Sequence, residues 1–303
     1  MSDLLPPPLD LQAILASPPP KLDFVLPGLV AGHVGAIVAP GSTGKSFLEL
    51  QIGIGIAAAV PIAEGAFPTP TAPGKVVLLA GEDDRVVLAH RLHAIVDCLT
   101  YQGAASGALF PAIDRGTLVA RLQENLRIYP LQGFRTRFHG AVGAPSLVEE
   151  LRILGAEARL VVIDPLRRFH DGDENDSGVM TDLVQACERI VAGTSAALLL
   201  AHHTNKASAL NGMGDQQQAV RGSSALTDAI RWQVNLVKMS TEEAKVLKVD
   251  AAERGFFIRL ETAKANYLAP QPTVWLRRLK GGALKQVSFG AHKVSGKGAG
   301  HGR

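Results

Sequence analysis

Short runs of apolar residues alternate with longer, mixed stretches from about residue 34 to residue 203. Five short runs are predominantly apolar, which predicts buried strands at residues 35–39, 75–80, 126–131, 159–164 and 196–203. Helical patterns fill the gaps between them, near residues 45–60, 85–99, 145–158 and 178–193. Apolar strands separated by helices favour an α/β fold whose central sheet is mostly parallel and covered on both faces.

The pattern changes after residue 230. Strand-like runs follow at 232–240, 255–264 and 273–280, with only one short helical stretch among them, at 240–248. Strands without full helices between them are typical of antiparallel pairing. We therefore predict a C-terminal antiparallel extension of the same sheet.

The two ends of the chain differ from its middle. Residues 1–30 are proline-rich, with a short helix predicted around Leu9–Ala16 between two proline triplets. This arm is either an unstructured leader or a segment that packs on a neighbouring subunit. Residues 31–285 form the predicted catalytic domain, and residues 286–303 form a basic, glycine-rich tail that we expect to be disordered.

Composition narrows the functional classes. The chain has 303 residues, of which 47% are hydrophobic, so one large core is within reach. Its net charge is only +3, so a nucleic-acid surface has to be a local patch. Two cysteines, no signal-peptide pattern and no apolar run long enough for a bilayer favour a cytoplasmic protein without a membrane partner.

The sequence "APGSTGKS", residues 39–46, stands between a predicted strand and a predicted helix. This context is typical of a P-loop, the pattern Gly-x-x-x-x-Gly-Lys-Ser/Thr, although Ala39 replaces the first glycine. Small residues let phosphate oxygens reach the backbone N–H groups, Lys45 supplies a cation for the β- and γ-phosphates, and Ser46 supplies a hydroxyl for Mg²⁺. We predict ATP and Mg²⁺ as ligands, rather than an ordinary glycine-rich turn. The predicted nucleotide-binding residues are Gly41, Ser42, Thr43, Gly44, Lys45 and Ser46.

Polar residues follow three of the buried strands. Asp164 ends one strand and can hold the Mg²⁺ shell, or else cap the following turn. Glu82 follows another strand and can activate water, or else belong to a solvated acidic cap with its neighbours Asp83 and Asp84. His203 is the residue we expect to sense the γ-phosphate, in preference to His202, because it lies further out of the strand.

Two polar segments leave these strand ends. Residues 204–226 form a segment that is too long for a tight turn and carries Lys206 and Arg221, while Arg168 lies in the segment 167–178. Loops from neighbouring strands can face one channel, where their cations contact single-stranded DNA. The alternative is two solvated surface loops.

The motifs together resemble a known family. "GxxGKS", "GED", "VVIDPLRRF", "HH", "GDQQQAVRGSSAL", "IRWQ" and "KANY" are similar to motifs of the RepA replicative helicases of IncQ-type plasmids. More broadly, the chain resembles the RecA-like hexameric ATPases that include DnaB, from the proline-rich arm to about Lys285. The resemblance implies a RecA-like P-loop core and a homohexamer that hydrolyses ATP between subunits.

The same resemblance implies roles for individual residues. It supports Glu82 as the activator of water and His203 as the link between nucleotide and DNA loops. Arg231 of "IRWQ" is implied to reach the γ-phosphate bound by a neighbouring subunit, with Lys264 of "KANY" as a second such cation. From the residues alone, without the resemblance, Arg231 can instead pair with Asp228 at the surface.

Two functions from different classes remain open at this point. The first is an ATP-dependent replicative DNA helicase that unwinds forked DNA and needs a separate primase and an origin-binding initiator, because no primase motif is present. The second, favoured by the low net charge, is a nucleotide-gated DNA-binding, recombination or regulatory ATPase that does not unwind. A small-molecule kinase fits the P-loop but leaves Glu82 and the long loops unexplained.

Overall fold

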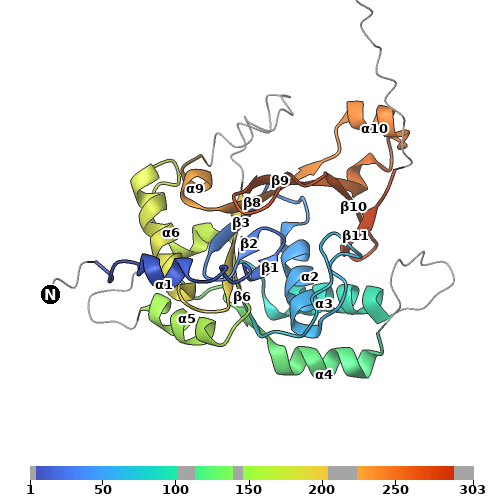
Figure 1. The fold of residues 1–303 in the computed structure, drawn as a ribbon. Coiled ribbons are helices and arrows are strands. Elements are labelled where there is room, and N and C mark those ends of the chain that lie inside the picture. The colour runs from blue at the N-terminus through green and yellow to red at the C-terminus, as the bar shows by residue number, and fades with distance from the viewer. Residues whose placement is uncertain (1–4, 101–112, 139–145, 204–223, 290–303) are drawn as a thin grey trace, which may run out of the picture.

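The structure, a computed structural model, describes residues 5–100, 113–138, 146–203 and 224–289. Within these residues, nine strands form one sheet with helices on both faces (Figure 1). In sheet order the strands are β11 (Leu284–Val287), β10 (Val274–Arg278), β9 (Phe257–Ala265), β8 (Trp232–Lys238), β3 (Val34–Ala39), β7 (Ala197–His203), β6 (Leu160–Asp164), β4 (Val76–Ala80) and β5 (Leu126–Pro130). The predicted α/β class and the five predicted strands are confirmed.

The helices divide the core into two apolar layers. One layer lies between the sheet and α2, α3 and α4, and the other lies between the sheet and α5 and α6. The strands supply both layers by alternation, so that Ile37 faces the first and Val38 the second. The helices are α1 (Leu11–Leu15), α2 (Lys45–Ala58), α3 (Arg85–Thr100), α4 (Arg115–Asn125), α5 (Leu147–Ala156), α6 (Ser177–Val191), α9 (Ser224–Ala229) and α10 (Thr241–Leu247), with short 3₁₀ turns at Leu166–Phe169 and Arg254–Phe256.

Strand direction positions the site. Strands β3, β4, β5, β6, β7 and β8 run parallel, so their carboxyl ends meet at one edge of the sheet. In register, Ala39 lies beside His203 and Ala80 lies beside Asp164. Four polar or loop-forming strand ends are thereby brought together from distant parts of the sequence, as expected for ligand sites in open parallel sheets.

The C-terminal strands correct one detail. The sequence pattern predicts residues 232–240 as part of the antiparallel extension, but β8 pairs parallel with β3 and antiparallel with β9. A parallel neighbour needs a crossover connection, and α9, which packs on α6, forms part of it. The antiparallel extension is therefore β9, β10 and β11.

The N-terminal segment has two parts. Residues 5–23 are exposed and carry α1, whose start is capped by the Asp10 carboxylate accepting from the Ala13 N–H at 3.0 Å. A hairpin of β1 (Phe24–Leu26) and β2 (Leu29–Val30) follows and is largely buried. Trp232 Nε1 donates to the Pro27 carbonyl at 2.8 Å, so the hairpin is attached to the central sheet. In the described part of the chain, no helix has the length and apolar character required to cross a membrane.

Candidate nucleotide-binding site

The loop between β3 and α2 has the backbone shape of a phosphate-binding loop. Ser42 and Gly44 adopt left-handed conformations, with φ of 61° and 102°. The Thr43 hydroxyl donates to the Pro40 carbonyl at 2.8 Å, which ties the two sides of the turn together. Helix α2 begins at Lys45 directly after this turn, so its N-terminal N–H groups and positive dipole end face the same space. Ala39 is the last residue of β3, an extended position at which glycine is not required.

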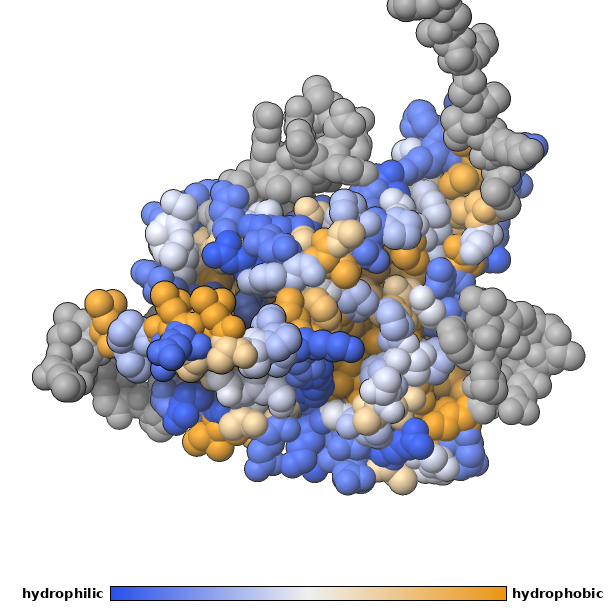
Figure 2. Space-filling model, viewed as in Figure 1, coloured by the Kyte–Doolittle hydropathy of each residue, from blue (hydrophilic) through white to orange (hydrophobic). Residues whose placement is uncertain are grey.

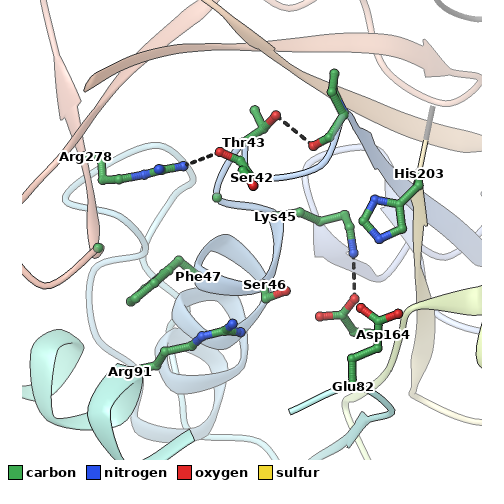
Figure 3. A pocket seen from close by; sticks show the side chains of 13 residues that line it. Ser42, Thr43, Lys45, Ser46, Phe47, Glu82, Arg91, Asp164, His203 and Arg278 are labelled. Atoms are coloured by element: carbon green, nitrogen blue, oxygen red, sulfur yellow. Dashed lines mark hydrogen bonds and ion pairs between the residues drawn. The ribbon is translucent and has the colours of Figure 1, made fainter. Parts of the chain in front are cut away.

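Lys45 and Asp164 form the centre of the site (Figure 3). Lys45 Nζ donates to Asp164 Oδ1 at 2.6 Å, and the two side chains are only 5% and 12% exposed. Burial alone would lower the lysine pKa, but the charges of Glu49 and Asp164 outweigh it and raise that pKa above its usual value. Burial likewise opposes ionisation of Asp164, yet Lys45 keeps the pKa of this carboxyl below its usual value. Both groups are therefore charged at neutral pH.

These two residues open onto a cavity of about 350 Å³. Its wall contains most of the residues predicted from the sequence, including Glu82 and His203 (Figure 3). Gly41 is exposed on the same loop and is not part of the wall. The complete lining is Pro40, Ser42, Thr43, Gly44, Lys45, Ser46, Phe47, Glu82, Arg91, Asp164, His203, Arg278 and Gly282.

The acidic segment after β4 divides its roles among three residues. Glu82 is exposed and lies beside Asp164 at the cavity (Figure 3). Asp84 accepts from the Val87 N–H at 2.8 Å and so caps α3, as predicted. Asp83 does not cap the helix; it holds Arg91 through two contacts, one of them 3.0 Å from Nη2 to Oδ1. This pairing leaves Glu82 as the acidic residue of the three that faces the cavity.

The two histidines at the end of β7 lie in different surroundings. His203 is exposed and borders the cavity, whereas His202 is buried in register with Val38. Burial lowers the pKa of both imidazoles. The predicted choice of His203 as the nucleotide-facing residue thus agrees with where its side chain lies.

Two side chains, Arg231 and Lys264, are predicted to reach the nucleotide bound by a neighbouring subunit. Both lie outside the cavity of their own chain. Arg231 is exposed immediately before β8, and Lys264 Nζ donates to the Thr227 carbonyl at 2.7 Å. Burial lowers the pKa of Lys264, and the charge of Arg231 lowers it further, so the two cations are close enough to repel each other.

The predicted DNA-contacting residues are placed only in part. Arg168 is exposed in the turn after β6, where its Nε donates to the Gly81 carbonyl at 3.1 Å. It therefore also links the ends of β6 and β4. Lys206 and Arg221, with most of the segment 204–226, lie outside the described residues.

Sequence reasoning missed several residues of the site. Arg278 of β10 donates through Nη2 to the Ser42 carbonyl at 3.0 Å and so holds the loop from the C-terminal strands. Gly282 lies so close to Phe47 that an added Cβ would fall 2.3 Å from Phe47 Cζ. The guanidinium of Arg91 lies over the Phe47 ring at 5.5 Å. No local pattern in the sequence indicates these contacts, because they join segments up to 236 positions apart.

Glu49 is a further missed residue. It lies one turn after Lys45 on α2, is 1% exposed, and its Oε1 is 3.9 Å from Lys45 Nζ. Burial and the charge of Asp164 raise its pKa well above the usual value, against the opposing effect of Lys45. The signal available in the sequence is a carboxylate in the run "FLELQIGIGIAAA", which is apolar apart from Glu49 and Gln51.

Burial of His202 predicts a pH dependence of stability. Burial in the folded state lowers the His202 pKa below the ordinary value of 6.5, although the charge of Glu174 raises it. Near pH 6.5 the unfolded chain therefore binds more protons than the folded chain. The free energy of unfolding should therefore fall as pH drops from about 7.5 to 5.5, by about 1.4 kcal/mol for each pKa unit of difference. Urea unfolding at both pH values measures it, and His202→Gln should flatten the slope. An unchanged slope in that variant would contradict the assignment.

The fold and the site together define a class of protein. A strand, a left-handed phosphate loop and a helix, with a buried lysine–aspartate pair at the carboxyl edge of a parallel sheet, are the features of a P-loop ATPase with a RecA-like fold. Residues 3–209 match the family described as "AAA domain", and the chain belongs to that family.

A solved structure agrees with the fold. The chain is similar to the "ATPase Domain of G40P", with 14% identity and a TM-score of 0.52 over 84% of this chain and 85% of that one. It is also similar to a chain from "The Structure Of A DnaB-Like Replicative Helicase And Its Interactions With Primase", with 14% identity and a TM-score of 0.49. That match covers 82% of this chain and 57% of the helicase chain.

Proposed function

We propose that this protein is an ATP-driven replicative DNA helicase of the RepA type found in IncQ-type plasmids. The observation that carries the proposal is the position of Glu82, an exposed carboxylate beside the Lys45–Asp164 pair at the cavity. This arrangement suits activation of water against a phosphate, which a kinase acting on a small molecule does not need. The family membership and the G40P-like fold support the same direction.

The residues present fit Mg²⁺ and ATP. Loop N–H groups, the start of α2 and Lys45 suit a polyphosphate, while the Ser46 hydroxyl and the Asp164 carboxylate are the hard oxygen donors that Mg²⁺ prefers. The metal, when bound, supplies positive charge that offsets the phosphate oxygens.

Each side chain then has a distinct task. Lys45 exchanges its Asp164 partner for the phosphates, which leaves the Asp164 carboxylate free for the metal side. Glu82 accepts a proton from the attacking water. His203 borders the same cavity and leads into the segment 204–226, so it can transmit the state of the phosphates to that segment. Arg231 and Lys264 act on the site of a neighbouring copy, since both lie outside their own cavity.

Assembly into a ring of six copies is part of the proposal. Helix α1 and its flanks expose four large apolar side chains, visible as an orange surface over α1 in Figure 2: Leu9, Leu11, Ile14 and Leu15. Such a surface suits packing of the exposed part of the predicted arm, residues 5–23, on the domain of a neighbouring copy, residues 31–285. A separate primase and an origin-binding initiator complete the proposed partners, and residues 286–303 have no assigned role.

Replacing Glu82 by glutamine tests the catalytic assignment. We expect turnover to fall by about 10²- to 10⁴-fold, because the amide cannot accept the proton, while ATP binding is retained. Steady-state hydrolysis and binding of a fluorescent ATP analogue measure the two effects. Asp84→Asn, which changes the neighbouring cap instead, serves as the matched control and should keep its turnover. Equal losses in both variants would contradict a catalytic role for Glu82.

Strand displacement separates the two candidate functions. The helicase predicts ATP hydrolysis stimulated by single-stranded DNA and displacement of a strand from a forked duplex. Hydrolysis and DNA binding without displacement by fully assembled protein would favour the nucleotide-gated binding ATPase, the alternative suggested by the low net charge of +3. Light scattering with and without nucleotide establishes the assembly, and a monomer throughout would exclude the ring.

A further inference from the structure

Helix α2 carries two buried polar side chains just after the phosphate loop, and they differ sharply in how they are satisfied. Gln51 is matched on both sides: its Nε2 donates to the Leu284 carbonyl at 2.8 Å, and its Oε1 accepts from the Leu284 N–H at 2.9 Å. Glu49 is more deeply buried, and no N–H or hydroxyl group among the described residues donates to its carboxyl oxygens, whose charged neighbours are Lys45 and Asp164. Gln51 therefore has a structural explanation, the attachment of α2 to β11, and Glu49 has none of that kind.

A carboxyl group in this position is costly. An unpartnered polar group loses its hydration on burial, and apolar residues of similar size are usually as stable or more stable in such places. Leu48, Leu50 and Ile52 show that leucine and isoleucine are tolerated at buried positions of this part of α2, so a leucine at position 49 is compatible with the helix. A group retained against this cost needs a reason other than stability.

The two charged groups beside Glu49, Lys45 and Asp164, indicate that reason. Glu49 Oε1 lies 3.9 Å from Lys45 Nζ, one helical turn away. Asp164, at the end of β6, accepts a hydrogen bond from the same ammonium at 2.6 Å. The ammonium thus lies between a close partner on β6 and a more distant one on its own helix. When Lys45 releases Asp164 to reach the phosphates, Glu49 is the acceptor that moves with the lysine, because both side chains belong to α2.

We propose that Glu49 is a positioning residue for Lys45, whose carboxyl oxygen keeps the ammonium aligned toward the phosphates when the contact with Asp164 is broken. The inference rests on the proposed ATP hydrolysis. An ionised or a protonated carboxyl group both present an acceptor oxygen to the ammonium, so the role does not depend on the charge of Glu49.

The kinetic test compares Glu49→Leu with Glu49→Gln. The leucine variant removes the acceptor at similar size, and we expect kcat to fall by about 10- to 100-fold, as for a misplaced catalytic group. KM should change far less, because the loop amides still bind the phosphates. Glutamine keeps an acceptor oxygen and should restore most of kcat. Urea unfolding of Glu49→Leu should show equal or higher stability than the wild-type protein.

Gln51→Leu is the matched control on the same helix. It loses two hydrogen bonds to Leu284, so it should unfold at lower urea while its folded fraction keeps the wild-type kcat. A wild-type kcat in Glu49→Leu, or equal losses in Glu49→Leu and Glu49→Gln, would overturn the positioning role.

A second readout needs no hydrolysis. In protein labelled with ¹⁵N-lysine and free of nucleotide, the buried Lys45 ammonium resonance, identified by its loss in Lys45→Met, should shift in Glu49→Leu and stay in place in Gln51→Leu. If the Lys45 resonance shifts in Glu49→Leu but the wild-type protein hydrolyses no ATP, the contact between Glu49 and Lys45 is supported and the proposed function is rejected. Normal hydrolysis with an unmoved resonance would instead reject the inference alone.

Discussion

Lys45→Met should reduce ATP turnover by at least about 10²- to 10³-fold, because it removes the cation that faces the developing charge on the phosphates. The same change should also lower the free energy of unfolding. Asp164 is only 12% exposed and would lose its 2.6 Å partner, and breaking a buried pair costs about 3–5 kcal/mol. Hydrolysis per folded molecule and urea unfolding measure the two effects separately.

A double variant distinguishes chemistry from folding. Lys45→Met combined with Asp164→Asn leaves no unpaired charge, so it should recover much of the lost stability while remaining inactive. Recovery of both properties would mean that Lys45 acts only through the fold. Turnover near the wild-type rate in Lys45→Met itself would remove the assignment of residues 39–46 as the nucleotide-binding loop.

The second large effect is expected at Arg231. This side chain is exposed and stands outside its own cavity, so its proposed action is on the nucleotide of an adjacent copy. Loss of an arginine that acts in this way costs about 10³- to 10⁵-fold in rate. Arg231→Ala should therefore be nearly inactive alone. Mixed with wild-type chains, it should depress hydrolysis more than dilution does, because each variant copy disables a neighbour.

The control for Arg231 is another exposed arginine. Arg152 on α5 pairs with Glu149 one turn away on the same helix, at 2.9 Å, and does not line the cavity. Arg152→Ala in the same mixtures should leave hydrolysis unchanged. An activity that falls in strict proportion to the fraction of Arg231→Ala would argue that the arginine acts within its own subunit.

Local patterns were sufficient for much of the fold. Four of the five predicted parallel strands, β3, β4, β6 and β7, could be predicted because each is a nearly continuous apolar run, which only a sheet covered on both faces can bury. The edge strand β5 is only partly buried. Where burial is partial, the signal weakens. Helix α4 was not predicted, and it presents only Leu118 as a buried residue. Strand β11 was not predicted either, since three of its four residues are only partly buried.

The phosphate-loop side of the site could be predicted for a similar reason. Its residues are consecutive in the sequence. A phosphate-binding loop requires small side chains followed by one lysine and one serine, and residues 39–46 contain all of these. Asp164, Glu82 and His203 followed from a rule about strand ends, which holds once the sheet is parallel. The pairing of Asp83 with Arg91 was not foreseen, because an acidic residue before a helix looks the same whether it caps the helix or binds an arginine on it.

The sequence by itself determined what is short in range: the strand and helix types, the nucleotide loop and the polar residues at strand ends. Tertiary structure alone decided that β8 runs parallel to β3, that Arg278 holds the loop from β10, and that the buried Glu49 faces Lys45. The physical reason is that strand direction and side-chain neighbours across the sheet depend on how the connections between strands lead the chain back to the sheet. Burial, which sets the charge state of each group, exists only after both apolar layers have closed over the sheet.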